Sequence, residues 1–77
     1  MYRAYILMET LGGKSGEVVR ALREISGITV ADVVTGPYDV IAVAQGPDQR
    51  AIGMLVLNQV RRIPGISKTM TCLAVDS

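Results

Sequence analysis

The sequence predicts an α+β fold whose elements follow the order β-α-β-β-α-β. Two stretches with helical apolar spacing each lie between two β-rich stretches. The joint between helix and strand also repeats, because Ile-Ser-Gly-Ile-Thr at residues 25–29 returns 38 residues later as Ile-Pro-Gly-Ile-Ser. Two βαβ halves in tandem form the split βαβ, or ferredoxin-like, sandwich with a four-stranded antiparallel sheet. A chance likeness of two helix-Gly-strand joints is the alternative explanation of the repeat.

The first half is predicted to contain a strand, a helix and a second strand. The first strand begins at residues 4–8 and ends before a pair of glycines. The helix is predicted over residues 14–25, with Ser15 as its N-cap and Gly27 beyond its end. A β-branched run predicts the second strand over residues 28–35. The predicted inner face of the helix consists of Val18, Leu22 and Ile25.

The second half repeats this order. Residues 38–45 are predicted as the third strand, and Asp48 as the N-cap of a second helix that ends before Gly65. Residues 66–75 are predicted as the last strand, and residues 76–77 as a short tail. The predicted inner face of the second helix consists of Ile52, Leu55, Val56, Val60 and Ile63. Met54 and Leu57 lie off this face, which favours assembly beyond a dimer.

Both faces of the predicted sheet are apolar. Right-handed crossovers place both helices on one face, so the strands should alternate apolar and polar residues if the other face met water. Instead, three of the strands are largely apolar on both faces. In the first strand one face has Ala4, Ile6 and Met8 and the other Tyr5 and Leu7, and in the third strand one face has Val40, Ala42 and Ala44 and the other Ile41 and Val43. In the last strand one face has Ile66, Met70, Cys72 and Ala74 and the other Thr69, Thr71, Leu73 and Val75. We therefore expect a homodimer packed sheet to sheet, a dimeric α+β barrel. A lone domain with a small-residue outer face is the alternative.

Length and composition exclude several classes of protein. The 77 residues suffice for one domain, and the absence of His together with a single Cys disfavours an internal disulfide, a protein-only zinc site and His-based catalysis. A net charge of +1 provides no basic field for nucleic acid. No apolar run approaches the about 20 residues of a membrane span, and no cleavable leader is recognisable. We expect a cytoplasmic protein that needs no cofactor and contacts no membrane.

The turn between the second and third strands is the strongest candidate for a binding site. Gly36 and Pro37 turn the chain and expose backbone N–H groups, and Asp39 places a carboxylate beside them. Such N–H groups can hold a carboxylate and Asp39 can hold an ammonium group, a pairing that suits a free amino acid. Tyr38 adds an apolar wall with a hydroxyl tip. The alternative is a plain hairpin turn that Asp39 caps locally, and the residue types alone favour it.

Two further features are interpreted as structural. Cys72 lies mid-strand among apolar neighbours, so it is predicted to be a small core residue and not a nucleophile. Residues 12–16 (Gly-Gly-Lys-Ser-Gly) superficially resemble a phosphate-binding loop, but the first Gly of G-x-x-x-x-G-K-[ST] is missing.

The run Val-Thr-Gly-Pro-Tyr-Asp-Val at residues 34–40, followed by Ile-Ser-Lys-Thr-Met-Thr at 66–71, resembles the effector-binding (RAM) domain of the Lrp/AsnC transcriptional regulators. The resemblance spans roughly residues 3 to 75. It implies a ferredoxin-like domain that dimerises through its sheets, often forms rings of dimers, and binds a small effector, usually an amino acid, between dimers. The motif is matched by Gly36, Tyr38 and Asp39, flanked by Thr35 and Pro37, and the Thr-containing last strand by Thr69 and Thr71. These seven are the predicted ligand-binding residues.

Full-length regulators of this family carry an N-terminal helix-turn-helix domain, whereas this chain starts at its first predicted strand. It therefore resembles the stand-alone form of the module, or an excised fragment, with 1–77 as a single RAM-like domain. The predicted function is non-enzymatic, amino-acid-responsive regulation of transcription without direct DNA contact, with a full-length Lrp/AsnC-type regulator as a candidate partner. The alternatives are an ACT-like amino-acid-binding domain, whose copies associate edge to edge, and a small dimeric α+β-barrel enzyme.

Overall fold

The structure is a computed structural model that describes residues 1–75. Its elements are β1 (Tyr2–Thr10), α1 (Ser15–Arg23), β2 (Ile28–Val33), β3 (Val40–Gly46), α2 (Gln49–Asn58), the 3-10 helix η1 (Val60–Arg62) and β4 (Ile66–Leu73). This order confirms the predicted βαββαβ fold. The tail predicted at residues 76–77 lies outside the described residues.

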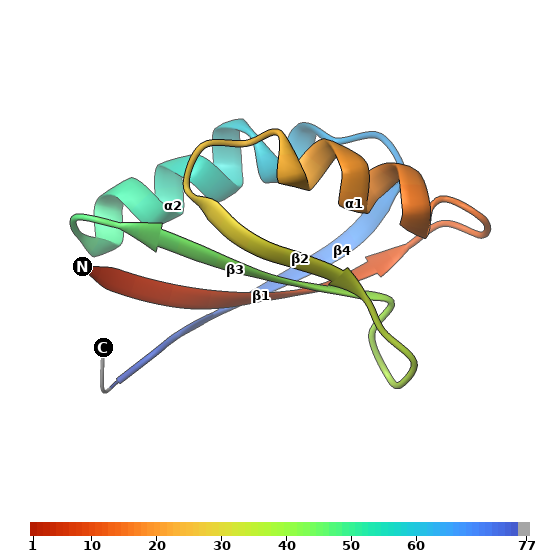
Figure 1. The fold of residues 1–77 in the computed structure, drawn as a ribbon, viewed down its shortest axis with the longest axis horizontal. Helices are drawn as coiled ribbons and strands as arrows, with labels where there is room; N and C mark the ends of the chain where they lie inside the picture. The colour runs from red at the N-terminus through yellow and green to blue at the C-terminus, as the bar shows by residue number, and fades with distance from the viewer. Residues whose placement is uncertain (76–77) are drawn as a thin grey trace.

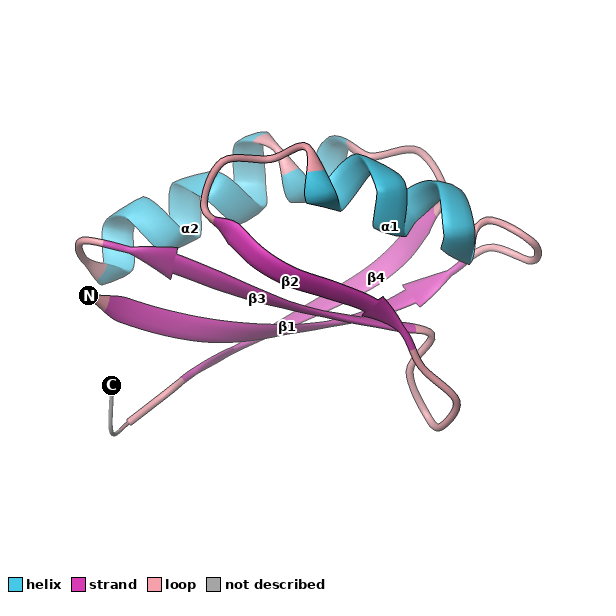
Figure 2. Cartoon of the chain, viewed as in Figure 1, coloured by secondary structure: helices cyan, strands magenta, loops and turns pink. Residues whose placement is uncertain are grey.

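The four strands form one antiparallel sheet in the order β2-β3-β1-β4. Both helices cover the same face of this sheet, with α1 over the side of β2 and α2 toward the side of β4 (Figures 1 and 2). The loop between β2 and β3 projects on the opposite side from the helices (Figure 1). We call the helix-covered side the inner face and the other side the outer face.

The core lies between the helices and the inner face. As predicted, alternate residues of β1 and β3 point into it, and the helices contribute their apolar stripes. Its buried members include Ala4, Ile6, Met8, Val40, Ala42 and Ala44 from the strands and Val18, Leu22, Ile52, Val56 and Val60 from the helical segments. Ile25, Leu55 and Ile63 are partly buried against this cluster.

Several predicted boundaries were wrong. The second helix does not continue to Gly65, because α2 ends at Asn58 and the 3-10 turn η1 follows it. α1 ends at Arg23 because the N–H groups of Glu24 and Ile25 bond to the carbonyls three residues earlier, which tightens the last turn. Ser15 is the first helical residue and not the N-cap, and its hydroxyl shares a 2.7 Å hydrogen bond with that of Thr10. β2 ends at Val33 and β3 begins at Val40, so residues 34–39 form a loop longer than predicted.

The predicted faces of β4 also need correction. A bulge between Glu9 and Thr10 shifts the pairing, so Thr10 pairs with Ile66 while Glu9 pairs with Lys68. Ile66 therefore packs against the core. Cys72 pairs with Tyr5 on the outer face and is exposed, so the prediction that it lies in the core of the chain was wrong.

The two repeated helix-to-strand joints have the same conformation. Gly27 and Gly65 have φ angles of 102° and 99°, which only glycine adopts readily. The carbonyl of Gly27 accepts a 2.8 Å bond from the N–H of Gln45, and that of Gly65 accepts a 2.8 Å bond from Leu11. Gly27 is thus bound to β3 of the second half, and Gly65 to the residue that follows β1 in the first half.

Candidate functional site

The loop at residues 34–39 is held at its base and open at its tip. The N–H of Val34 donates to the carbonyl of Asp39, and the N–H of Asp39 donates to the carbonyl of Met8, both over 2.9 Å. At the tip, Thr35, Gly36 and Pro37 are exposed. A Cβ placed on Gly36 would meet no atom within 4 Å. The tip therefore offers an accessible turn on a fixed base.

Asp39 ties this loop to β1. Its Oδ2 accepts a 2.8 Å hydrogen bond from the backbone N–H of Thr10, at the bulge where the pairing with β4 shifts. This contact spans 29 residues of sequence, so the carboxylate has a long-range structural role and not the purely local one of a turn cap. A carboxylate offers about four lone-pair sites, so Asp39 keeps the capacity to accept another donor.

Tyr38 connects the loop to the outer face. Its hydroxyl donates to the sulfur of Met70 on β4 over 3.7 Å, a long distance typical of a weak sulfur acceptor. Met70 pairs with Leu7, which in turn pairs with Ile41, so this contact lies over the outer face. The hydroxyl of Tyr38 thus links the loop to a residue of the outer face.

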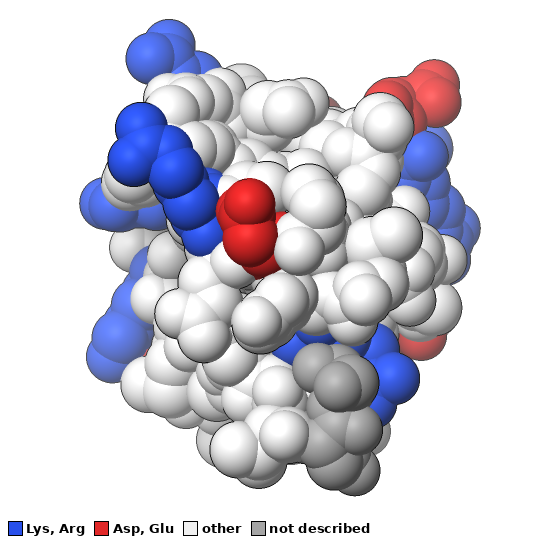
Figure 3. Space-filling model, turned by 90° about the vertical axis from the view of Figure 1, so that its left-hand side faces the viewer, with Lys and Arg blue, Asp and Glu red and all other residues white. Residues whose placement is uncertain are grey.

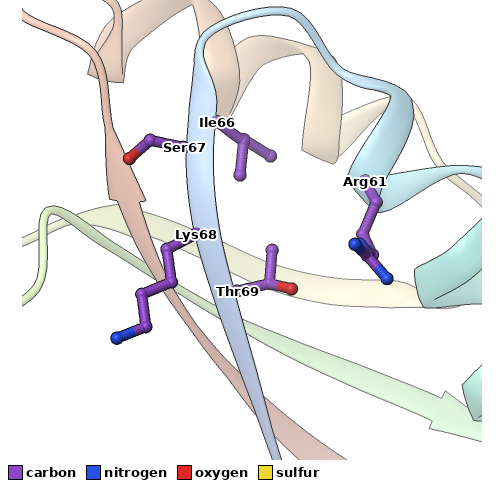
Figure 4. Close-up of a pocket in the computed structure, with 5 residues that line it drawn as sticks. All are labelled: Arg61, Ile66, Ser67, Lys68 and Thr69. Atoms are coloured by element: carbon purple, nitrogen blue, oxygen red, sulfur yellow. The ribbon is translucent and has the colours of Figure 1, made fainter.

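Thr69 and Thr71 lie on the other side of the sheet. They pair with Met8 and Ile6, two core residues, so their side chains point to the inner face. Thr69 lines a cavity of about 390 Å³ beside Arg61 of η1. Figure 4 shows Arg61 and Thr69 directed into the same space, whereas Lys68 extends to the opposite side of the strand. Thr71 lines a separate groove of about 320 Å³ between α2 and β4.

Within one chain the structure brings Thr35, Gly36, Pro37, Tyr38 and Asp39 together but keeps Thr69 and Thr71 apart from them. The loop lies over the outer face, and the two threonines face the helix side. A ligand that touches both sets would therefore have to lie between two copies of the chain.

The outer face is apolar at its centre and charged at its margin. The strand pairing places its residues in two rows across the sheet: Val30, Val43, Tyr5 and Cys72, and Asp32, Ile41, Leu7 and Met70. Arg3, Glu9, Gln45 and Lys68 border these rows. Within residues 1–75 no helix covers this face, and Tyr5 remains 39% exposed. Exposed apolar patches of this kind are typical of protein–protein contacts.

Most of the charged residues lie on the helices and loops and not on the outer face. Figure 3 shows the end of the molecule where β1 begins, with Lys and Arg side chains at the margins and mostly uncharged residues at the centre. In residues 1–75 no three His, Cys, Asp or Glu side chains gather as potential metal ligands. None of the helices described is both long and apolar enough to cross a membrane.

Arg61 and Met70 were not among the predicted site residues. From the sequence, Arg61 was interpreted as a charge that complements the C-terminal end of the second helix. In the structure it lies in the 3-10 turn after Asn58 and lines the cavity beside β4. Met70 was recognised as an apolar strand residue, but its contact with Tyr38 spans 32 residues and leaves no local signal.

The family model of the Lrp/AsnC ligand binding domain matches residues 3–77. The chain belongs to this family. No functionally curated protein matches it. The match selects the Lrp/AsnC type over the ACT-like alternative, and it identifies the chain as a domain from a regulatory family.

Solved structures agree with the family in fold. FFRP-DM1 is 32% identical with a TM-score of 0.91, and the alignment covers 97% of this chain and 100% of that one. The hypothetical protein PHS023 from Pyrococcus horikoshii is 31% identical with a TM-score of 0.92, over 100% and 93% of the two chains. The transcriptional regulator NMB0573 from Neisseria meningitidis, solved in complex with L-Met, has the same fold: 17% identity, a TM-score of 0.85, and coverage of 99% of this chain and 51% of that one.

Proposed function

We propose that this chain is an amino-acid-responsive regulatory module that works in the cytoplasm as a homo-oligomer and modulates transcription without enzymatic activity. The observation that carries the proposal is the match of residues 3–77 to the Lrp/AsnC ligand binding domain. The net charge of +1 gives no field for the phosphates of DNA, so a second protein would make the DNA contact. A full-length Lrp/AsnC-type regulator is the candidate for that role, and a pull-down with such a regulator tests it.

The first contact in this proposal is a homodimer that packs the outer faces of two sheets together. Sheets packed face to face lie about 10 Å apart, which allows the apolar rows to interdigitate. The margin of the outer face carries Arg3 and Lys68 as well as Glu9 and Asp32. Because both signs are present, a two-fold axis can place opposite charges against each other at the edge of the contact.

The effector site in this proposal combines the loop of one copy with β4 of another. The exposed N–H groups of the tip suit the carboxylate of an amino acid, and the remaining lone pairs of Asp39 suit its ammonium group. Tyr38 provides a wall for its side chain, while Thr69 and Thr71 come from a neighbouring copy. Since the site is complete only between copies, the effector stabilises the assembly by its differential affinity for it.

Calorimetric titration with each of the twenty amino acids, combined with sedimentation with and without ligand, tests effector sensing. L-Met is the first ligand to try, because NMB0573 was solved in complex with it. We expect heat with one or a few amino acids and a change in assembly size with the same ones. A protein that gives no heat and no change in size with any of them contradicts the proposal.

Asp39→Asn tests the site itself. The amide oxygen of Asn still accepts the bond from the Thr10 N–H, so the base of the loop is preserved, but the negative charge is lost. A hydrogen bond to a charged group contributes about 1.5–3 kcal/mol, so we expect effector affinity to fall about tenfold to a hundredfold. Asp32→Asn, at the margin of the outer face, is the matched control and should leave affinity unchanged. Equal affinity of Asp39→Asn and the wild-type protein would place the effector elsewhere.

A further inference from the structure

β4 is exposed on both of its faces. Six of its eight residues are exposed, although it lies in the same sheet as the nearly buried β3. On the outer face Met70 and Cys72 are uncovered, and on the inner face Thr71 and Leu73 are uncovered because α2 does not extend over them. An outer-face dimer would cover only one of these two sides.

The free edge of β4 carries backbone groups that point away from the sheet. The N–H of Ala74 donates to the carbonyl of Arg3 over 2.9 Å, so the N–H and C=O groups of Ala74 point toward β1. In an antiparallel pair this direction alternates along the strand. Thr69, Thr71 and Leu73 therefore direct their N–H and C=O groups outward from the edge.

The opposite edge of the sheet, formed by β2, is partly occupied by a side chain. There, the side chain of Arg23 donates to the carbonyl of Ala31 on β2 through Nε at 3.2 Å and through Nη2 at 2.8 Å. The same guanidinium lies 3.7 Å from a carboxylate oxygen of Asp32. A charged side chain across an edge strand is a common device against further strand pairing. Among residues 1–75, no comparable contact is found along β4.

We propose that β4 pairs antiparallel with β4 of a second copy, about a two-fold axis at Thr71. Thr71 then lies opposite Thr71 of the partner subunit, and Thr69 opposite Leu73 of the partner subunit. All outward groups of Thr69, Thr71 and Leu73 are used, which gives up to about six backbone hydrogen bonds. Threonine pairs directly opposite each other stabilise antiparallel strands. The one charged residue of β4, Lys68, lies opposite Ala74 of the partner subunit, so no like charges meet.

The surface beside this edge fits a further strand. A groove of about 320 Å³ runs between α2 and β4, lined by Gly53, Val56 and Leu57 from the helix and by Leu73 from the strand. Leu57 is 54% exposed and Leu73 is 43% exposed. The added strand of the second copy would lie next to this groove and cover both leucines. The contact therefore combines backbone pairing with apolar burial, as in other cases of strand addition.

The pairing of β4 with β4 of a second copy does not propagate, because both copies use the same strand for it. Pairing of β4 with β2 of another copy would join the copies head to tail, in a ring or an open filament, and the Arg23 side chain bound to β2 opposes it. Pairing of β4 with β4 of a second copy covers the free β4 edge of each of the two copies. It is separate from the outer-face dimer, and where both contacts form, the assembly contains an even number of copies. This inference goes beyond the proposed function and needs no effector.

Thr71→Pro is the direct test. Proline removes an N–H that points away from β1, so no bond within the chain is lost, and edge strands tolerate proline at such positions. Without added amino acid, we expect sedimentation to show the wild-type assembly reduced to a dimer of 8.2 kDa chains. Val33→Pro removes the equivalent outward N–H on β2 and is the matched control, with no change in size expected. A folded Thr71→Pro protein of wild-type size overturns the proposal.

Disulfide trapping gives a second measurement that does not depend on proline. In a Cys72→Ser background, Thr71→Cys places two thiols on strands whose opposed Cα atoms lie about 5.5 Å apart, within the range of a disulfide. We expect a cross-linked dimer under mild oxidation, and none from Val33→Cys in the same background. The cross-link should persist when Leu7→Asp disrupts the outer face, which separates this contact from the outer-face dimer. Absence of the cross-link, or a cross-link only to another protein, overturns the pairing of β4 with itself.

Discussion

The two faces of the sheet are built from the same kinds of residue but have different surroundings. On β1, Ile6 is fully buried, whereas its neighbour Leu7 is only partly covered and Tyr5 is 39% exposed. All three are large and apolar, and they differ only in the face to which the strand directs them. An apolar pattern thus specifies that a face must be covered without specifying which chain covers it.

The inner face is covered locally. Each helix follows a strand closely in the sequence, so the apolar stripe of α1 or α2 reaches the sheet through a short connection. The outer face has no such neighbour among residues 1–75. We therefore expect substitutions on the inner face to affect folding, and equivalent substitutions on the outer face to affect association.

Ile6→Asp should have the largest effect. It places a carboxylate among core residues that offer no partner, because the buried set contains no polar or charged side chain. Even when protonated, a buried carboxyl group without a hydrogen-bond partner costs about 2–7 kcal/mol, a large part of the roughly 5–15 kcal/mol by which a domain is stable, and the lost apolar packing adds to this. We expect loss of the folded protein, measured by circular dichroism. A variant with native helix and strand content would contradict the assignment of Ile6 to the core.

Leu7→Asp applies the same substitution one residue further along β1. Its side chain lies on the outer face beside Ile41 and Met70, where water reaches it in a single chain. We expect a native circular dichroism spectrum but loss of the outer-face dimer, because two carboxylates would be buried at the contact. Sedimentation measures the association. A Leu7→Asp protein as unfolded as Ile6→Asp would show that the two faces do not differ in role.

Most of the fold could be predicted because its signals are local. Apolar periodicity, the Gly27 and Gly65 joints and the Asp48 cap, whose Oδ1 accepts a 2.7 Å bond from the N–H of Ala51, all act within a few residues. The face of Ile66 could not be predicted in the same way. It depends on a bulge at Glu9, whose cause lies in the pairing of two distant strands.

The candidate site was predictable only in part for the same reason. The turn residues Gly36 and Pro37 predict a loop between the second and third strands, and the structure has a loop there. The bond from Thr10 to Asp39 and the contact of Tyr38 with Met70 join segments 29 and 32 residues apart, so nothing in the local sequence indicates them. Whether the seven predicted residues bind a ligand stays a prediction.

Gly27→Ala tests how firmly the helix layer is fixed over the inner face, and its effect should be smaller. The φ angle of 102° is unfavourable for alanine, and the new Cβ would lie 2.7 Å from Cδ1 of Leu55 on α2. We expect a loss of about 1–3 kcal/mol in the free energy of unfolding, measured with urea. Gly12→Ala is the control, since its Cβ would meet no atom within 4 Å. Equal stability of the two variants would contradict this packing.

Tyr38→Phe should have the smallest effect on stability, and it probes a side-chain contact between the loop and the outer face. The lost bond is a 3.7 Å contact to sulfur at a partly exposed site, so we expect a change of about 0.5 kcal/mol or less in the free energy of unfolding. Met70→Leu removes the acceptor and keeps the apolar bulk, so a double-mutant cycle isolates the contact.

The informative readout of this pair is association and not stability. If the Tyr38–Met70 contact transmits the state of the loop to the outer face, both single variants should weaken the dependence of dimerisation on effector, and the double variant should weaken it no further. Sedimentation at several effector concentrations measures this dependence. Additive effects of the two substitutions would mean that the loop and the outer face act separately, and that the effector regulates assembly only by bridging two copies.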